Sequence, residues 1–340
     1  MNSTTKISSI EAIALALIVS INRIILYLPQ NALLSSGSAA ALNILYVGII
    51  SLILTFIIYK LYRKFVGSDI IDISEFLGGK IFKNIISFII LVYIIFMSAI
   101  LIREFCEVIH ILYYKNASIV YLIISFIIVG VITNFISSRS VIKTNLFFTI
   151  IMIVSLLLCF AFAVPNITYQ RIFPILGNGI DEIFGKGLLN IFSFNGLMAL
   201  YLIPSMTKSP TEKNLKRIYM SSAIITVIIL FLATICLLLS FSFVTQFENI
   251  SPLYLLISNN HFGEYFQHPE SLFILVWVLS FMSYLNISIM FILKILKKVT
   301  SVKNSKPFII PVCLLIFILA LAPSNLFDTR QINTFTSKYI

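Results

Sequence analysis

Residues 183–206 read IFGKGLLNIFSFNGLMALYLIPSM, and this stretch decides the fold. It is long and apolar enough to cross a membrane, because a spanning helix needs about 20 mostly apolar residues. Its middle holds the polar run Ser193, Phe194, Asn195 and Gly196, and Pro204 follows near its end. Polar residues inside a membrane helix are costly, so such a run needs a structural or functional reason.

A second apolar stretch, residues 10–33, carries the same kind of interruption. Its polar run is Ser20, Ile21, Asn22 and Arg23. Polar residues in a membrane helix often only hydrogen-bond to a neighbouring helix, and for one helix alone this is the preferred interpretation. Two interrupted helices at matching positions are also typical of a midplane binding site, where freed backbone groups meet a small zwitterion or ion. From the pattern alone the two interpretations carry equal weight.

The composition of the whole chain is that of a polytopic membrane protein. Of its 340 residues 59% are hydrophobic and 11% are charged, whereas about 25% are charged in a typical soluble domain. We expect a single transmembrane domain over residues 1–340, with a polar C-terminal tail, 324–340, that cannot span. The predicted spanning segments are residues 10–33, 40–60, 83–109, 117–137, 143–165, 183–206, 219–244, 270–296 and 306–323.

The distribution of basic residues predicts a cytoplasmic N-terminus. With that orientation, 17 of the 24 Lys and Arg residues lie in or beside the cytoplasmic segments, as the positive-inside rule requires. The net charge of +11 therefore reflects membrane topology. It does not indicate a nucleic-acid partner, because the basic residues are spread over short loops between apolar runs.

The two interrupted helices are the first and the sixth, so they run in opposite directions across the membrane. This spacing is typical of an inverted repeat of five plus five helices, whose interrupted helices meet at the membrane midplane. We expect the first repeat to cover about residues 10–165 and the second about 183–323. The candidate ligand-binding residues are then Ser20, Ile21, Asn22, Arg23, Ser193, Phe194, Asn195 and Gly196.

Charged residues at membrane depth form a second set of candidates. Arg23 either receives the carboxylate of a ligand or pairs internally with Glu104 or Glu107, since an isolated charge there is costly. Arg103 and Glu107 are four residues apart on one helix face. They form either a pair that snorkels at the membrane surface, which we favour, or a gate or coupling site together with Glu104.

The eighth predicted helix, 270–296, carries polar residues that either line a cavity or pack between helices. These are Ser283, Tyr284, Asn286 and Ser288, and we favour packing. An enzyme is not expected, because the chain has no nucleotide-binding glycine loop, no HExxH and no Cys/His spacing for a metal. No cofactor is expected either.

Several short segments together resemble the permease-like B subunit of endospore germinant receptors, within the amino acid–polyamine–organocation transporter superfamily. The resemblance covers nearly the whole chain and depends on the order and spacing of these segments. They are KIS (6–8), LYLP (26–29), DISEFLG (72–78), FPILGNG (173–179), LIP (202–204) and PESLF (269–273), with Gly187, Phe192, Gly196 and Trp277.

The resemblance implies an all-α LeuT-like fold with a pocket at the breaks of helices 1 and 6. It further implies a small germinant such as an amino acid as ligand, the A subunit and the lipoprotein C subunit of the receptor as partners, and the spore inner membrane as location. The chain departs from the family in having Ser-Ile-Asn-Arg in place of a glycine-rich break and in lacking a tenth spanning helix. An ion-coupled amino acid transporter and a structural subunit with a vestigial pocket are the alternatives.

Overall fold

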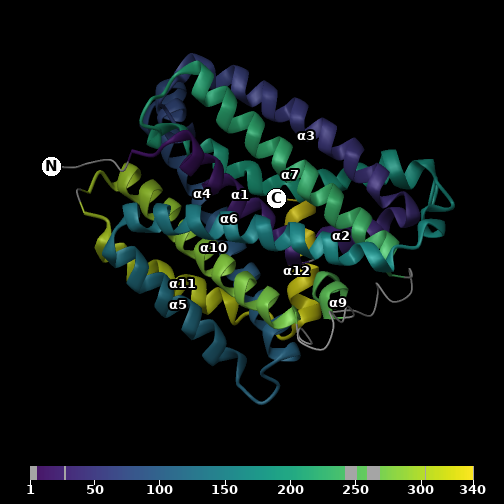
Figure 1. The fold of residues 1–340 in the computed structure, drawn as a ribbon. Helices are drawn as coiled ribbons and strands as arrows, with labels where there is room; N and C mark the ends of the chain where they lie inside the picture. The colour runs from purple at the N-terminus through teal and green to yellow at the C-terminus, as the bar shows by residue number, and fades with distance from the viewer. Residues whose placement is uncertain (1–5, 27, 242–250, 259–268, 303, 340) are drawn as a thin grey trace.

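The computed structural model describes residues 6–26, 28–241, 251–258, 269–302 and 304–339. For residues 23–26, 28, 166, 252, 269 and 337–339 it describes the backbone only. The described chain is helical, and its one β-bridge joins Ile7 to Thr207. Figure 1 shows the helices packed into one bundle, with α3 and α7 side by side.

The helices follow the predicted apolar segments. The α-helices are α1 (Ser9–Leu26), α2 (Leu28–Ser36), α3 (Ala40–Tyr62), α4 (Ile70–Leu112), α5 (Ile119–Ile136), α6 (Ser138–Ala163), α7 (Glu212–Ser240), α9 (Pro252–Ser258), α10 (Pro269–Thr300), α11 (Ile309–Ala320) and α12 (Leu326–Tyr339). Tighter or wider turns form η1 (Gly37–Ala39), η2 (Arg63–Phe65), η3 (Val164–Asn166), η4 (Tyr169–Ile172), η5 (Asp181–Gly185), η6 (Lys186–Tyr201), η7 (Pro204–Met206) and η8 (Lys306–Phe308).

Seven helices within the described ranges are long and apolar enough to cross a membrane. Two shorter apolar helical stretches, Ser9–Asn22 and Lys306–Ala320, correspond to the first and ninth predicted segments. The structure is therefore that of a multi-pass integral membrane protein. The described helix beyond Ala320, Leu326–Tyr339, is not among these apolar helices.

Helix 6, by which we mean η5 to η7, runs antiparallel to α1 and α2 along its whole length. At one end the amide of Ile7 donates to the carbonyl of Met206 at 2.8 Å, and the amide of Lys208 donates to the carbonyl of Ile7 at 2.8 Å. At the other end the Ser36 hydroxyl donates to the carbonyl of Glu182 at 3.4 Å. The first and sixth helices are therefore paired in opposite directions, as the inverted repeat requires. We call the two ends of the bundle the Ile7 face and the Ser36 face.

The polar run of the first helix does not unwind the backbone, contrary to expectation. Ser20 donates to the carbonyl of Ala16 at 3.0 Å and Asn22 to that of Ile18 at 2.8 Å, so both side chains bond back to the main chain of a regular helix. The α-helix continues past this run to Leu26. Helix 6, in contrast, is irregular throughout, because η6 has 3₁₀ geometry over 16 residues, far beyond the usual three or four.

Helix α4 begins at the Ile7 face with a side-chain cap and a bend. The Asp69 carboxylate accepts from the amides of Ile71 and Asp72 at 3.1 and 3.2 Å, and the Asp72 side chain caps the Asp69 amide in return. This capping box fixes the first turns. Gly78 and Gly79 then leave helical geometry, with φ of +67° at Gly79, a backbone conformation that glycine adopts without steric cost. The segment before this bend is therefore set off from the spanning part of α4.

The polar C-terminal tail forms the helix α12, which packs against α4 and η6. Its buried stripe is polar, with Thr329 and Asn333 fully buried and Thr336 nearly so, while Phe327 and Phe335 are more than 60% exposed. Polar residues facing the protein and apolar residues facing outward are typical of a helix at membrane depth. The tail is therefore part of the bundle even though it is too short to span it.

Candidate functional site

A small cavity lies at mid-bundle between four helical segments, and it is the candidate binding site. Its volume is about 50 Å³, room for a few water molecules. Val19 of α1 forms one side, and Asn195 and Gly196 of η6 face it. The other lining residues are Ile90, Tyr93, Ile94 and Met97 of α4, Met198, Ala199, Tyr201 and Leu202 of helix 6, and Tyr284, Ser288 and Phe291 of α10.

The lining of this cavity is mostly apolar, with a few polar groups. None of the described residues that line the cavity is charged, and its polar groups are the Asn195 amide, the Ser288 hydroxyl and three tyrosines. A few polar groups in an apolar lining are typical of small-molecule sites, where they fix the orientation of the ligand.

Close packing of helix 6 on α1 forms the wall beside Gly196. A Cβ atom at Gly196 would lie 2.6 Å from the Cα and 2.8 Å from the Oγ of Ser20. The two polar runs therefore meet at the centre of the bundle, as the matched positions predicted. Ser20 is fully buried beneath this contact but does not line the cavity itself.

The other predicted site residues point elsewhere. Asn22 donates to the carbonyl of Ser280 on α10 at 3.3 Å, and Ile21 is fully buried. Phe194 lines a separate groove beside α3, and Ser193 is buried away from the cavity lining. The side chain of Arg23 lies outside the described residues. Whether it receives a ligand carboxylate or pairs internally with Glu104 or Glu107 therefore stays a prediction.

The polar residues of α10 divide between cavity and packing. Tyr284 and Ser288 line the cavity. Ser283 donates to the side chain of Asn145 at 3.1 Å, and Asn286 accepts from Thr133 at 2.8 Å, so these two connect helices. The packing interpretation is therefore confirmed for Ser283 and Asn286 and wrong for Tyr284 and Ser288, which lie four residues apart on the cavity side of α10.

Arg103, Glu104 and Glu107 are buried near the Ser36 face, so the surface-pair interpretation is wrong. Arg103 and Glu107 are 5% and 8% exposed and form an ion pair at 2.8 Å. Glu104 is fully buried and receives a hydrogen bond from the Asn333 amide at 2.9 Å, with the Arg330 guanidinium at 3.4 Å. The helix α12, which the sequence did not predict, covers these residues and takes them out of contact with the surface.

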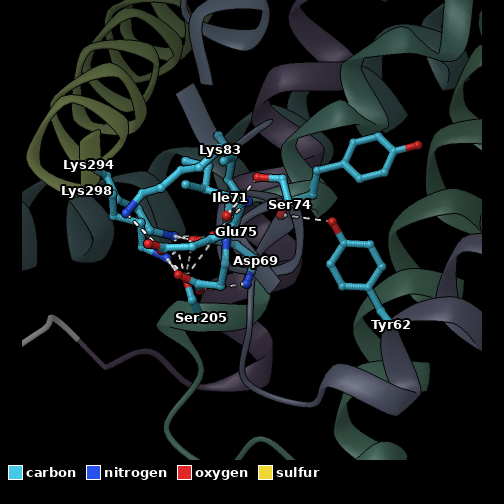
Figure 2. A network of polar contacts seen from close by, with 12 residues as sticks. Tyr62, Asp69, Ile71, Ser74, Glu75, Lys83, Ser205, Lys294 and Lys298 are labelled. Atoms are coloured by element: carbon cyan, nitrogen blue, oxygen red, sulfur yellow. Dashed lines mark hydrogen bonds and ion pairs between the residues drawn. The ribbon is translucent and has the colours of Figure 1, made fainter. Parts of the chain in front are cut away.

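A second polar cluster, which sequence reasoning missed, joins three elements at the Ile7 face (Figure 2). Asp69, fully buried, lies 3.1 Å from the ammonium of Lys294 and 2.7 Å from that of Lys298. The Ser205 hydroxyl also donates to Asp69, at 2.7 Å, and Lys298 contacts Asp72 at 2.6 Å. The cluster ties the start of α4, the end of helix 6 and the last turns of α10 together.

The charges around Asp69 determine its protonation state. Burial alone raises the pKa of this carboxyl, but Lys294, Lys298 and the Ser205 hydroxyl oppose that effect and outweigh it. The pKa of Asp69 therefore lies well below its ordinary value, and the group is a carboxylate at any physiological pH.

Lys294 connects this cluster to the cavity. Its ammonium donates to the Ser205 hydroxyl at 2.6 Å and to the carbonyl of Leu202. Leu202 also lines the cavity. Phe291, one turn before Lys294 on α10, lines the cavity as well. A change in the cavity that moves the end of helix 6 would therefore disturb the ion pairs at the Ile7 face.

Sequence signals for the missed residues were weak. Ile90, Ile94 and Met97 are ordinary apolar residues of a spanning helix, and nothing in their type marks a cavity wall. The Asp69 cluster left more signal, since two acids spaced as a capping box stand at the start of α4 and two lysines four residues apart lie near the end of α10.

Comparisons with known proteins agree with this geometry. The family model described as spore germination protein, a spore permease family, matches residues 6–329. The spore germination protein GerQB of Bacillus cereus is 25% identical over 310 residues, covering 89% of this chain and 82% of its own length. Among solved structures, an outward-open Na⁺-coupled sialic acid symporter with bound substrate aligns with a TM-score of 0.66 at 14% identity, covering 100% of this chain and 80% of the symporter. This last likeness shows a transporter-like fold of the predicted LeuT type.

Proposed function

Because this chain belongs to the spore germination protein family, we propose that it is the membrane subunit of a germinant receptor. In this proposal it binds a small germinant such as an amino acid in the central cavity and signals to partner subunits. The observation that supports it most directly is the cavity itself. Asn195 and Gly196, chosen from the sequence as ligand contacts, line it together with α1, α4 and α10, the arrangement expected where interrupted helices meet.

The cavity in its present form is too small for a whole amino acid, so binding is expected to change the packing around it. A ligand shifts a conformational equilibrium only by the difference in its affinity for the two states. Lys294 can transmit such a shift, because it bonds both to the carbonyl of Leu202 in the cavity wall and to Asp69 at the Ile7 face. We propose that germinant binding moves helix 6 and loosens this cluster, and that partner subunits read the change.

The partners in this proposal are the A subunit and the lipoprotein C subunit of the receptor, in the spore inner membrane. The basic residues support a cytoplasmic location for the Ile7 face, which carries Lys294 and Lys298. The Ser36 face then lies on the side from which germinants arrive.

An ion-coupled amino acid transporter is the second candidate, favoured by the fold shared with a Na⁺-coupled symporter. One experiment separates the two. The gene is disrupted, spores are scored by dipicolinate release over a panel of amino acids, and uptake of the same labelled amino acids is measured in growing cells. Lost germination to one or a few compounds with normal uptake supports the receptor; lost uptake with normal germination supports the transporter.

A further inference from the structure

The groove beside α3 is larger than the central cavity and shares a wall with it. Its volume is about 330 Å³, roughly twice that of a cavity that holds one benzene ring. Asn195, Met198 and Tyr201 of η6 line both the groove and the central cavity. A molecule in the groove would therefore contact the same residues of helix 6 as a ligand of the central cavity.

The groove opens toward the membrane. Among the described residues that line it, Leu54 is the one exposed side chain. Leu54 lies in the second half of α3, and its neighbours Ile53 and Ile57 are 54% and 48% exposed. Exposed apolar side chains along a spanning helix face the lipid tails, which are equally apolar. A molecule dissolved in the bilayer can therefore reach the groove from the side of the bundle.

Two buried hydroxyl groups in this groove have no hydrogen-bond partner within the described part of the chain. Ser51 and Thr55 line the groove and are 5% and 4% exposed, and no described group bonds to either side chain. Other buried hydroxyls of the bundle bond back to the carbonyl four residues earlier, as those of Thr226 and Thr234 do at 2.8 Å. An unused O–H donor in apolar surroundings costs free energy. A ligand with a hydrogen-bond acceptor would recover that cost.

The remaining side chains of the groove indicate the chemical class of such a ligand. None of the described lining residues is charged, and an ion without a partner is costly at this depth. Four of the lining residues are aromatic, namely Phe192, Phe194, Tyr201 and Tyr219. Aromatic side chains pair favourably with other rings. The groove therefore combines aromatic walls with two hydroxyl donors.

We propose that the groove beside α3 is a second ligand site, which takes a neutral aromatic molecule from the bilayer whose carbonyl accepts hydrogen bonds from Ser51 and Thr55. These two residues are four apart on α3, so their Cβ atoms are about 5–6 Å apart on one face. One carbonyl oxygen can then lie within hydrogen-bond distance of both hydroxyls. The inference goes beyond the proposed function, because this site is reached from the membrane and is separate from the germinant cavity.

Benzophenone, a neutral ketone with two rings, is a direct probe of this site, because near-ultraviolet light attaches it to nearby C–H bonds. The full chain in nanodiscs is irradiated over a range of benzophenone concentrations, and the labelled peptides are quantified by mass spectrometry. We expect saturable labelling within residues 51–58 or 191–201. Diphenylmethane, which keeps both rings but has no carbonyl, should compete for the same site.

The variant Ser51→Ala/Thr55→Val removes both hydroxyls with little change of shape. The benzophenone concentration at half-saturation should rise about tenfold, because the ketone loses both donors. The affinity for diphenylmethane, measured by competition, should stay the same, since this molecule accepts no hydrogen bond.

The chain offers a matched control on α7. Ser222 and Thr226 are also four residues apart and fully buried, and neither lines the groove or the central cavity. Ser222→Ala/Thr226→Val therefore makes the same two changes outside the site and should leave half-saturation unchanged.

Three outcomes would overturn the proposal. The first is labelling that does not saturate and spreads over lipid-facing side chains such as Ile49, which is 57% exposed. The second is equal half-saturation in Ser51→Ala/Thr55→Val and the unmodified protein. The third is an equal rise in the control variant on α7.

This readout is independent of germination. If benzophenone labels the groove as expected but disruption of the gene leaves germination normal, the groove site stands and the receptor function fails. If germination is lost but labelling does not depend on Ser51 and Thr55, the receptor function stands and the groove site fails.

Discussion

Gly196 of helix 6 and Ser20 of α1 touch so closely that no side chain fits between them. A Cβ atom at Gly196 would lie 2.6 Å from the Ser20 Cα, which is backbone and cannot rotate away. This contact places the irregular stretch of η6 against a regular helix and forms one wall of the cavity.

Gly196→Ala should therefore destabilise the protein, by roughly 1–3 kcal/mol, the usual cost of overpacking. The measurement is thermal unfolding of the purified protein in nanodiscs. Gly130→Ala is the matched control, because its new Cβ would meet the far end of the flexible Ile289 side chain at 2.8 Å. An equal loss of thermal stability in both variants would mean that contact with the Ser20 main chain adds no extra cost.

Asn195→Leu should abolish the germination response while leaving protein levels normal. The side chain lines the cavity, and leucine would fill the space and remove one of its few polar groups. Spores carrying the variant are compared with spores carrying Asn84→Leu, the same change at an exposed position of α4. A dose response like that of unmodified spores would leave Asn195 with a packing role only.

Lys298→Met should loosen the Ile7 face. Lys298 contacts Asp69 at 2.7 Å and Asp72 at 2.6 Å, and its loss leaves the buried Asp69 with fewer donors, at a cost of roughly 1–3 kcal/mol. The check is thiol labelling of a cysteine introduced at Thr207, a buried residue beside the cluster. Lys297→Met, one residue away, is the control; labelling that rises equally in both would contradict a specific role of the Lys298 contacts.

Ionisation of Asp69 should not make its cluster respond to pH in the physiological range. The pKa of Asp69 is lower in the folded protein than in the unfolded chain, so its stabilisation is fully present above the unfolded value of about 3.9. It is lost only as the pH falls through the lower folded value. The rate of Thr207→Cys labelling is divided by that of an exposed cysteine at the same pH, because the thiolate is the reacting form. This ratio should be constant from pH 5 to pH 7, and a midpoint inside that window would mean that a group other than Asp69 controls the opening.

The sequence predicted the parts of this structure that depend on apolar length and on position. Nine apolar segments, the antiparallel pairing of the first and sixth helices, and Asn195 and Gly196 at the cavity all followed from these. Unwinding at Ser20 did not occur, because its hydroxyl bonds back to Ala16 and the helix stays intact. A pattern of residue types cannot distinguish a side chain that breaks a helix from one that bonds to it.

Two other features needed the three-dimensional packing. Met97 is a cavity residue only because α4 lies opposite helix 6 across the cavity, and its apolar type gives no sign of this. The tail is too polar for a span, yet it forms α12 because Asn333 finds a partner in Glu104 inside the bundle. Composition alone predicts that a polar segment stays out of the membrane. In the folded bundle, however, polar residues can find buried partners.

The join between Ile7 and the end of helix 6 has a consequence for genetics. Both of its hydrogen bonds use only main-chain atoms, so almost any amino acid at Ile7, Met206 or Lys208 can form them. A screen that replaces side chains one at a time would detect only the burial of Ile7 and Met206 and would not detect these main-chain hydrogen bonds. Proline at position 7, which lacks the amide hydrogen, or removal of residues 1–8, would reveal a dependence that such a screen leaves hidden.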